Sequence, residues 1–168
     1  MILGIGIDMV ECDRFLDWSG FKKSRIFTKK ELDYADASQA HGERHLANFW
    51  AVREAFLKAI GTGFGDDIQF SDVSVIHDEL GRPNVLLAGG AKAALKALSD
   101  DAKIHVSITD QGDYSSAIVI TASGKVQDSS LRYYEGNNPP SQSMKPLLVN
   151  EYSNGLYIFA GIKVGVVF

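Results

Sequence analysis

The amino-terminal segment constrains the fold more than any other feature, because it predicts a strand that is bulky on one face and nearly bare on the other. Residues 2–10 read ILGIGIDMV. Strand alternation puts the large apolar side chains on one face and Gly4, Gly6 and Asp8 on the other. Glycine inside a strand often marks a place where another backbone or a ligand comes close. We therefore expect an element with small side chains to pack on the glycine face.

A helix rich in small side chains is predicted later in the chain, where residues 50–63 read WAVREAFLKAIGTG. At about 100° per residue, Ala47, Ala51, Glu54 and Lys58 fall on one narrow stripe, and the large apolar side chains collect on the other side. An alanine-lined stripe is a suitable partner for a glycine-faced strand. If the two pack, a carboxylate from each is brought to one end of the contact.

The pair of Glu54 and Lys58 does not by itself indicate a function. Glutamate and lysine four residues apart are a common exposed stabiliser of helices, worth about 0.2–0.5 kcal/mol, and Asp8 alone would equally fit a strand-ending turn or a helix N-cap. The helix ends, however, at a Gly-Thr-Gly run, residues 61–63, although one glycine is enough to end a helix. Two close carboxylates also repel unless a proton or a cation lies between them. A small set of oxygen ligands suits Mg²⁺, which keeps waters and shares its coordination sphere with substrate phosphates.

The composition is that of one globular domain with a real core, since 45% of the 168 residues are hydrophobic. The single cysteine, Cys12, excludes an internal disulfide framework and fits a reducing compartment. The apolar start is interrupted by Asp8 and lacks a basic run, so we expect no signal peptide, and no apolar run approaches the length of a membrane span. The net charge of −4 argues against a general nucleic-acid binder. We expect a cytoplasmic protein with no membrane or nucleic-acid partner.

Positive charge is concentrated in one segment of this acidic chain. Residues 14–30 contain six basic side chains against a single acidic one, Asp17; the basic residues are Arg14, Lys22, Lys23, Arg25, Lys29 and Lys30. A solvated basic surface is the simplest explanation. The functional alternative is a docking patch for an acidic partner, since complementary charge steers encounter.

The remaining segments predict an α+β fold in which an antiparallel sheet packs against the long helix. Thr28 is placed to cap a helix whose third residue is Glu31, a spacing typical of a helix start. Apolar runs on either side of turn-forming residues predict two strand pairs. The expected helices are residues 28–37, 40–60 and 90–98, and the expected strands are residues 2–10, 73–76, 84–87, 103–109 and 114–121.

One of these strands carries polar side chains of interest. His105 and Ser107 share one face of the strand at residues 103–109. A lone histidine on a strand is more often structural than catalytic. Together with a hydroxyl two residues away, it could instead bind phosphate.

The end of the chain differs in character from the rest. Residues 127–145 are polar around Gly-Asn-Asn-Pro-Pro, which is typical of a linker, whereas residues 156–167 are apolar and β-prone. We therefore expect a domain over residues 1–125 and an extension over residues 126–168. An added hairpin, a subunit contact and an aggregation-prone appendage all remain open for that extension.

Several linked motifs resemble those of the holo-acyl-carrier-protein synthases, the small 4′-phosphopantetheinyl transferases. The resemblance covers about residues 2–122, and the order and spacing of the motifs make it specific. The matching motifs are GIDMVE at residues 6–11, RIFT at 25–28, the helix and turn at 50–63, DELGRP at 78–83 and HVS at 105–107.

The resemblance implies the 4′-phosphopantetheinyl transferase fold and a definite reaction. Enzymes of this family transfer 4′-phosphopantetheine from coenzyme A to a serine of apo acyl carrier protein, and they release adenosine 3′,5′-bisphosphate. The product, holo acyl carrier protein, serves fatty acid synthesis. The resemblance also implies Mg²⁺ as cofactor and a homotrimer with its sites between subunits.

Site residues follow from the same resemblance. Asp8 and Glu54 match the metal ligands, and Glu54 and Lys58 match the catalytic residues. The serine proton goes to Glu54, directly or through a water, or to a metal-activated water. The positions that match the coenzyme A site are Arg53, Lys58, Gly61, Thr62, Gly63, Arg82, Pro83, Asn84, His105 and Ser107. The positions that match the docking site of the acidic carrier protein are Arg14, Lys22 and Arg25.

The chain also departs from the family pattern. Relatives often carry arginine where this chain has His45 and Phe49, lysine where it has Arg53, and Ser-His where it has Thr109 and Asp110. We therefore expect the contacts to the nucleotide to differ, whereas both metal ligands and Lys58 are kept.

Two other classes of function fit parts of the sequence. One is a different Mg²⁺-dependent phosphoryl or nucleotidyl transferase built on the same carboxylates, which the absence of a Walker A or dinucleotide glycine motif disfavours. The other is a non-catalytic module that binds an acidic partner through residues 14–30. That reading leaves Asp8, Glu54 and Lys58 unexplained.

Overall fold

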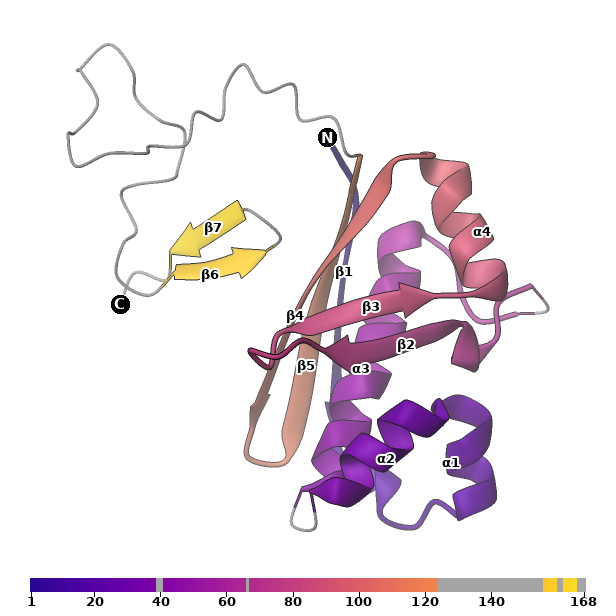
Figure 1. The fold of residues 1–168 in the computed structure, drawn as a ribbon, viewed down its shortest axis with the longest axis vertical. Helices are drawn as coiled ribbons and strands as arrows, with labels where there is room; N and C mark the ends of the chain where they lie inside the picture. The colour runs from indigo at the N-terminus through magenta and orange to yellow at the C-terminus, as the bar shows by residue number, and fades with distance from the viewer. Residues whose placement is uncertain (39–40, 66, 124–155, 160–161, 166–168) are drawn as a thin grey trace. The chain divides into compact units, whose positions relative to one another are not determined.

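A three-stranded antiparallel sheet carries the long helix α3 on one of its faces (Figure 1). The computed structural model describes residues 1–38, 41–65, 67–123, 156–159 and 162–165. It divides into two units, Met1–Gly124 and Lys125–Phe168. The sheet has the order β1-β5-β4, so β1 and β4 form its edges; the bounds are Ile2–Glu11 for β1, Tyr114–Ser123 for β5, Ala102–Gln111 for β4 and Gly42–Ile60 for α3.

The glycine face of β1 packs against the helix as the sequence predicts. A Cβ atom added to Gly4 would collide with the carbonyl oxygen of Ala59, and one added to Gly6 would collide with that of Ala55. The two backbones therefore touch where neither residue has a side chain to keep them apart. This contact confirms the predicted pairing of the glycine-faced strand with the helix, although the two alanines at the contact lie outside the predicted stripe. It also fixes where the end of β1 meets the middle of α3.

The opposite face of the sheet is apolar and exposed in the single chain. Ile5, Ile7 and Met9 of β1 have exposed fractions of 57%, 62% and 67%. Their cross-strand partners on β5 are Ile120, Ile118 and Ser116, only half-buried on this face. Among the residues that the structure describes, the large apolar side chains of β1 are thus exposed on this face.

Smaller elements complete the first unit, and they agree with most of the predicted ones. The β2–β3 hairpin and α2 lie where the sequence predicts them, and α1 and α2 gather at one end of α3, away from α4 (Figure 1). The short helix α1, which Ser19 caps by accepting the Lys22 N–H at 3.2 Å, was not among the predicted elements. The bounds are Cys12–Phe15 for η1, Gly20–Ile26 for α1, Lys29–Ala37 for α2, Phe70–Asp72 for η2, Val73–His77 for β2, Pro83–Leu87 for β3 and Gly89–Leu98 for α4.

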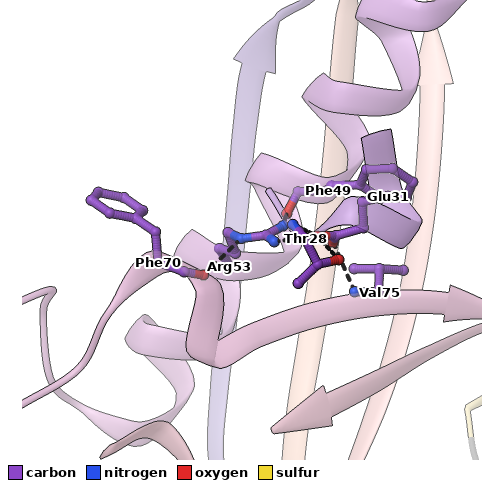
Figure 2. Close-up of polar contacts among 6 residues, drawn as sticks. All are labelled: Thr28, Glu31, Phe49, Arg53, Phe70 and Val75. Atoms are coloured by element: carbon purple, nitrogen blue, oxygen red, sulfur yellow. Dashed lines mark hydrogen bonds and ion pairs between the residues drawn. The ribbon is translucent and has the colours of Figure 1, made fainter. Parts of the chain in front are cut away.

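A buried ion pair joins three of these elements (Figure 2). The Arg53 guanidinium donates to the Glu31 carboxylate at 2.6 Å, and both side chains are completely buried. Glu31 also accepts from the backbone N–H and the hydroxyl of Thr28, each at 2.9 Å, and from the Val75 N–H at 2.9 Å. Thr28 and Glu31 hold the predicted positions at the start of α2. The carboxylate does more than cap that helix, because it ties α2 to both α3 and β2.

The second unit contains one antiparallel strand pair, β6 (Leu156–Phe159) with β7 (Ile162–Gly165). A hairpin was one of the alternatives open for this segment. The predicted linker at residues 127–145 lies outside the described residues. Among the helices that the structure describes, none is long and apolar enough to cross a membrane.

Candidate active site

Asp8 and Lys58 meet at the edge of the sheet where β1 crosses α3. The Lys58 Nζ lies 2.8 Å from Asp8 Oδ1 and donates also to the Ile7 carbonyl at 3.0 Å. The Asp8 side chain is 15% exposed and the Lys58 side chain 52%. Strand alternation directs Asp8 toward the helix, and the long lysine side chain reaches back along α3 to meet it. The pair is thus open to solvent on the lysine side.

Glu54 lies one helical turn before Lys58 and completes a charged cluster. Burial raises the pKa of the Glu54 carboxyl, and the nearby Asp8 carboxylate raises it further. The cations of Lys58 and Arg14 act in the opposite direction. Two carboxylates and two cations therefore lie close enough to influence one another, as the pairing of β1 with α3 predicts for Asp8, Glu54 and Lys58.

The donor set at this edge fits a small, hard cation that brings its own remaining ligands. Asp8 and Glu54 supply carboxylate oxygens, which Mg²⁺ prefers. Burial, and secondarily the Asp8 charge, raises the pKa of Glu54, and a cation between the two carboxylates would offset their repulsion. The described part of the chain contains no group of three or more His, Cys, Asp or Glu side chains that could hold a metal ion by themselves. A metal here would thus complete its coordination with waters and substrate oxygens.

The glycine run at the end of α3 forms an exposed turn. Gly61 takes the left-handed conformation with φ of 75°, and the Thr62 N–H donates to the Leu57 carbonyl at 3.0 Å, which is the usual geometry of a glycine helix end. A cavity of about 530 Å³ adjoins the turn, and small residues of α4 form its other wall. Its lining includes Thr62, Gly63, Ile68, Gly90, Ala93 and Ala97.

Of the predicted coenzyme A residues after β2, Arg82 lies on the exposed turn, whereas the half-buried Pro83 and the exposed Asn84 begin β3. Arg82 Nε is 3.0 Å from Asp78 Oδ2. The pKa of the Asp78 carboxyl is lowered mainly by the Arg82 backbone N–H, with the Leu80 N–H and the guanidinium charge acting in the same direction. Asn84 lines a second cavity of about 380 Å³, together with Lys92 and Lys96 of α4.

His105 and Ser107 lie on the face of the sheet that points away from α3. The register pairs His105 with Ile120 and Ser107 with Ile118, and these β5 residues pair in turn with Ile5 and Ile7 of β1. His105 is 9% exposed, and its Nδ1 has no hydrogen-bond partner among the described residues. Burial, and secondarily the Lys103 charge, lowers the pKa of its imidazole. Within one chain, these two residues are separated from Asp8 by the thickness of the sheet and by its width.

Arg53 is placed differently from the prediction that it contacts coenzyme A. Its side chain is fully buried, and the guanidinium donates to the carbonyls of Phe49 and Phe70 at 2.9 and 3.1 Å as well as to Glu31. No surface of Arg53 is left for a ligand. The sequence held the signal, because Arg53 is four residues from both Phe49 and Leu57 and so belongs to the apolar side of the helix. An arginine there requires a buried carboxylate partner.

The three predicted docking cations are exposed, and each lies over an aromatic ring. The Arg14 guanidinium carbon is 4.6 Å from the centre of Trp50, the Lys22 Nζ is 3.7 Å from that of Trp18, and the Arg25 guanidinium is 5.8 Å from that of Phe21. Sequence reasoning missed the proximity of Arg14 to Glu54. The turn of η1 creates that proximity, and no periodicity in the sequence predicts it.

Known proteins resemble the first unit of the chain in sequence. The family model of the 4′-phosphopantetheinyl transferase superfamily matches residues 4–119. A holo-[acyl-carrier-protein] synthase of Treponema denticola is 42% identical over 122 residues, which cover 71% of this chain and 98% of that protein. One of Bacillus subtilis is 36% identical over 124 residues, which cover 71% of this chain and 95% of that protein.

Solved structures resemble it in fold. A holo-[acyl-carrier-protein] synthase of Neisseria meningitidis matches with a TM-score of 0.65 and 28% identity, over 73% of this chain and 100% of that one. A complex of such an enzyme with coenzyme A, from Chronobacterium ammoniagenes, matches with a TM-score of 0.63 and 28% identity, over 73% of this chain and 98% of that one.

Proposed function

The chain belongs to the 4′-phosphopantetheinyl transferase superfamily, and we propose that the cluster of Asp8, Glu54 and Lys58 is its active site. The chain acts as a holo-[acyl-carrier-protein] synthase, which transfers 4′-phosphopantetheine from coenzyme A to a serine of apo acyl carrier protein. The observation that carries the site assignment is the convergence of two carboxylates and Lys58 where β1 meets α3.

Charge neutralisation is the main task at a reacting pyrophosphate, because phosphoryl transfer needs little covalent work from the protein. Asp8 and Glu54 would hold Mg²⁺, which when bound supplies positive charge to the phosphate oxygens. Lys58 adds a second positive charge. Its ammonium has three donors, and Asp8 and the Ile7 carbonyl use two of them. The remaining N–H, on the half-exposed end of the side chain, is available for a phosphate oxygen.

Glu54 is the residue that we propose as acceptor of the serine proton, through a water molecule. Its carboxylate lies in the charged cluster beside Asp8 and Lys58, and carboxylates are among the side chains that act as general bases in enzymes. The exposed turn at residues 61–63 follows Lys58 directly. We assign this turn, and residues 82–84 after β2, to coenzyme A binding.

A second copy of the chain completes the proposed site. His105 and Ser107, which also belong to the coenzyme A residues, lie on the other face and at the other edge of the sheet from Asp8. Only another subunit can bring its own His105 to the first subunit's Asp8. The exposed apolar face that includes Ile5, Ile7 and Met9 supplies a surface for such an assembly. We propose a homotrimer, acting in the cytoplasm.

The decisive experiment incubates the protein with Mg²⁺, coenzyme A and apo acyl carrier protein and then weighs the carrier by mass spectrometry. We expect a phosphopantetheine adduct that disappears when the metal is chelated. Asp8→Ala, Glu54→Ala and Lys58→Ala should each lower the rate by about 10²-fold or more, as loss of a main electrostatic stabiliser does. No adduct with the unmodified protein would disprove the proposed function, whereas full activity in the variants would disprove only the site.

A further inference from the structure

We propose that Trp18 and Trp50 are positioning residues that hold Arg14 and Lys22 at a fixed spacing for the acidic carrier protein. The inference rests on the proposed function, because it concerns how that partner is received. It adds a role for two indole rings that touch neither the reacting atoms nor, in our assignment, the carrier itself.

The four side chains form a continuous stack across three segments of the chain. Arg14 of η1 lies over Trp50 of α3 at 4.6 Å, and Lys22 of α1 lies over Trp18 at 3.7 Å. The two indoles contact each other edge to face, with centres 5.7 Å apart and planes at 89°. The order is therefore cation, ring, ring, cation. Both cation distances are within the range of favourable cation–π contacts.

The core fixes the rings, whereas the cations stay at the surface. Trp50 is 8% exposed and belongs to the hydrophobic core. Phe15, which is completely buried, packs against Trp18 at 4.8 Å and against Trp50 at 6.1 Å. Arg14 and Lys22 are exposed. The position of each charge is thus set by a ring that cannot move away from it.

Arg14 and Lys22 are not held in ion pairs by carboxylates of the described residues. In the part of the chain that the structure describes, neither residue forms a salt bridge, whereas Lys29 of the same basic segment pairs with Asp33 at 2.7 Å. Cations that are ordered but not in a salt bridge suit an acidic partner, because ordering a long side chain at an interface lowers the affinity. The rings have already imposed that order before the partner arrives.

The stack also links the docking surface to the reacting site. Trp50 and Glu54 are one turn apart on α3, and Arg14 is close enough to Glu54 for its charge to act on that carboxyl. A carrier protein held by Arg14 is therefore held beside Glu54. Fixing Arg14 over Trp50 sets where the carrier serine arrives, which is a requirement of position rather than of chemistry.

The test compares Trp18→Leu and Trp18→Phe with the unmodified protein in steady-state transfer assays. Trp18 is partly exposed, and the phenylalanine variant keeps a ring beneath Lys22 if the leucine variant does not fold. We expect Trp18→Leu to raise KM for the apo carrier about three- to fivefold, as loss of an exposed cation–π contact implies. KM for coenzyme A and kcat should stay unchanged. Trp18→Phe should recover most of the carrier affinity.

A double-variant cycle with Lys22→Ala separates positioning from a general structural effect. If Trp18 acts through Lys22, Trp18→Leu should add nothing to the rise in carrier KM that Lys22→Ala already causes. Three outcomes would each overturn the inference. The carrier KM of the double variant could rise by the product of the two single effects, the carrier KM could stay unchanged in Trp18→Leu, or KM could rise equally for carrier and coenzyme A. These outcomes all require transfer by the unmodified protein, whose complete absence would instead reject the proposed function.

Discussion

At the scale of single residues, the charged cluster shows which contacts can be predicted from the periodicity of strands and helices. Strand alternation and the 100° step of a helix place Asp8, Glu54 and Lys58 together, because each rule fixes a direction relative to the backbone. Periodicity does not predict the position of Arg14, and it predicts the burial of Arg53 but not its partner. Arg14 comes near Glu54 through the turn of η1, which no repeat in the sequence encodes. Arg53 follows the helical period onto the apolar side, where its buried partner Glu31 comes from another helix.

His77 offers a test of burial at the same scale. Its ring stacks on Tyr34, with centres 4.7 Å apart and planes at 13°, and its Nδ1 is buried without a hydrogen-bond partner among the described residues. Burial lowers the pKa of His77 and also that of His45, where the charge of His77 acts in the same direction. Below about pH 6.5 these two imidazoles therefore bind protons in the unfolded chain more readily than in the folded chain. Stability is full above that pH and falls as the pH drops toward the folded pKa.

We expect His77→Phe to weaken this pH dependence. The substitution keeps a ring against Tyr34 and removes both the buried nitrogen and the titration. The unfolding free energy, measured by urea denaturation at pH 7.5 and pH 5.0, should fall less in the variant than in the unmodified protein. The difference should stay well below about 1.4 kcal/mol per pH unit, because the imidazole is only partly buried. Equal losses in the two proteins would contradict the assignment.

At the scale of elements, the contact of β1 with α3 determines the geometry of the site. Gly6→Ala should destabilise the protein by about 1–3 kcal/mol or more, since its Cβ would collide with the backbone of Ala55. It should also lower transfer activity beyond the effect on stability, because the collision moves Asp8 away from Glu54. Urea denaturation and the transfer assay measure the two effects. Gly20→Ala is the matched control, because no atom lies within 4 Å of the added Cβ, and it should change neither quantity.

The buried ion pair makes a second prediction about elements. Glu31→Ala should lower the unfolding free energy by about 3–5 kcal/mol, because it leaves the Arg53 guanidinium buried without its carboxylate. The double change Glu31→Leu with Arg53→Met should cost clearly less, since no charge is then left unpaired. Urea denaturation of both variants gives the comparison. A double variant as unstable as the single one would show that the hydrogen bonds to Thr28 and Val75, and not the charges, dominate.

Most elements could be predicted from sequence, because their patterns are local. Alternation finds β1, β4 and β5, and the Thr28 and Glu31 spacing finds α2. The sequence does not predict α1, because the helix has only seven residues and its lysines and arginine fit a charged surface equally well. Its cap, Ser19, was the available signal. The proposed roles of Trp18 and Trp50 depend on contacts between segments far apart in sequence, so the amino-acid sequence alone does not predict them.

At the scale of the whole molecule, the sheet itself divides the proposed site. Asp8 and Glu54 belong to the helix side at the β1 edge, and His105 belongs to the outer face at the β4 edge. Strand alternation predicts that His105 and Ser107 share a face. It does not say that this face is opposite to Asp8, because that depends on the register of the strand pairs. The assembled protein should therefore contain sites with one half from each of two subunits.

Mixed assemblies test this division directly. Asp8→Ala and His105→Ala damage opposite halves of a shared site, so each variant alone should be impaired at every site. When the two are co-expressed and assemble at random in a closed ring, about one quarter of the sites should combine two intact halves. We expect the mixture to transfer phosphopantetheine at about that fraction of the normal rate, by the mass-spectrometric assay.

A mixture of Asp8→Ala with Glu54→Ala is the control, because both substitutions lie in the same half and no intact site can form. If the mixture of Asp8→Ala with His105→Ala is only as active as the average of the two separate variants, each subunit works alone. The site would then have to be built without the His105 of another subunit.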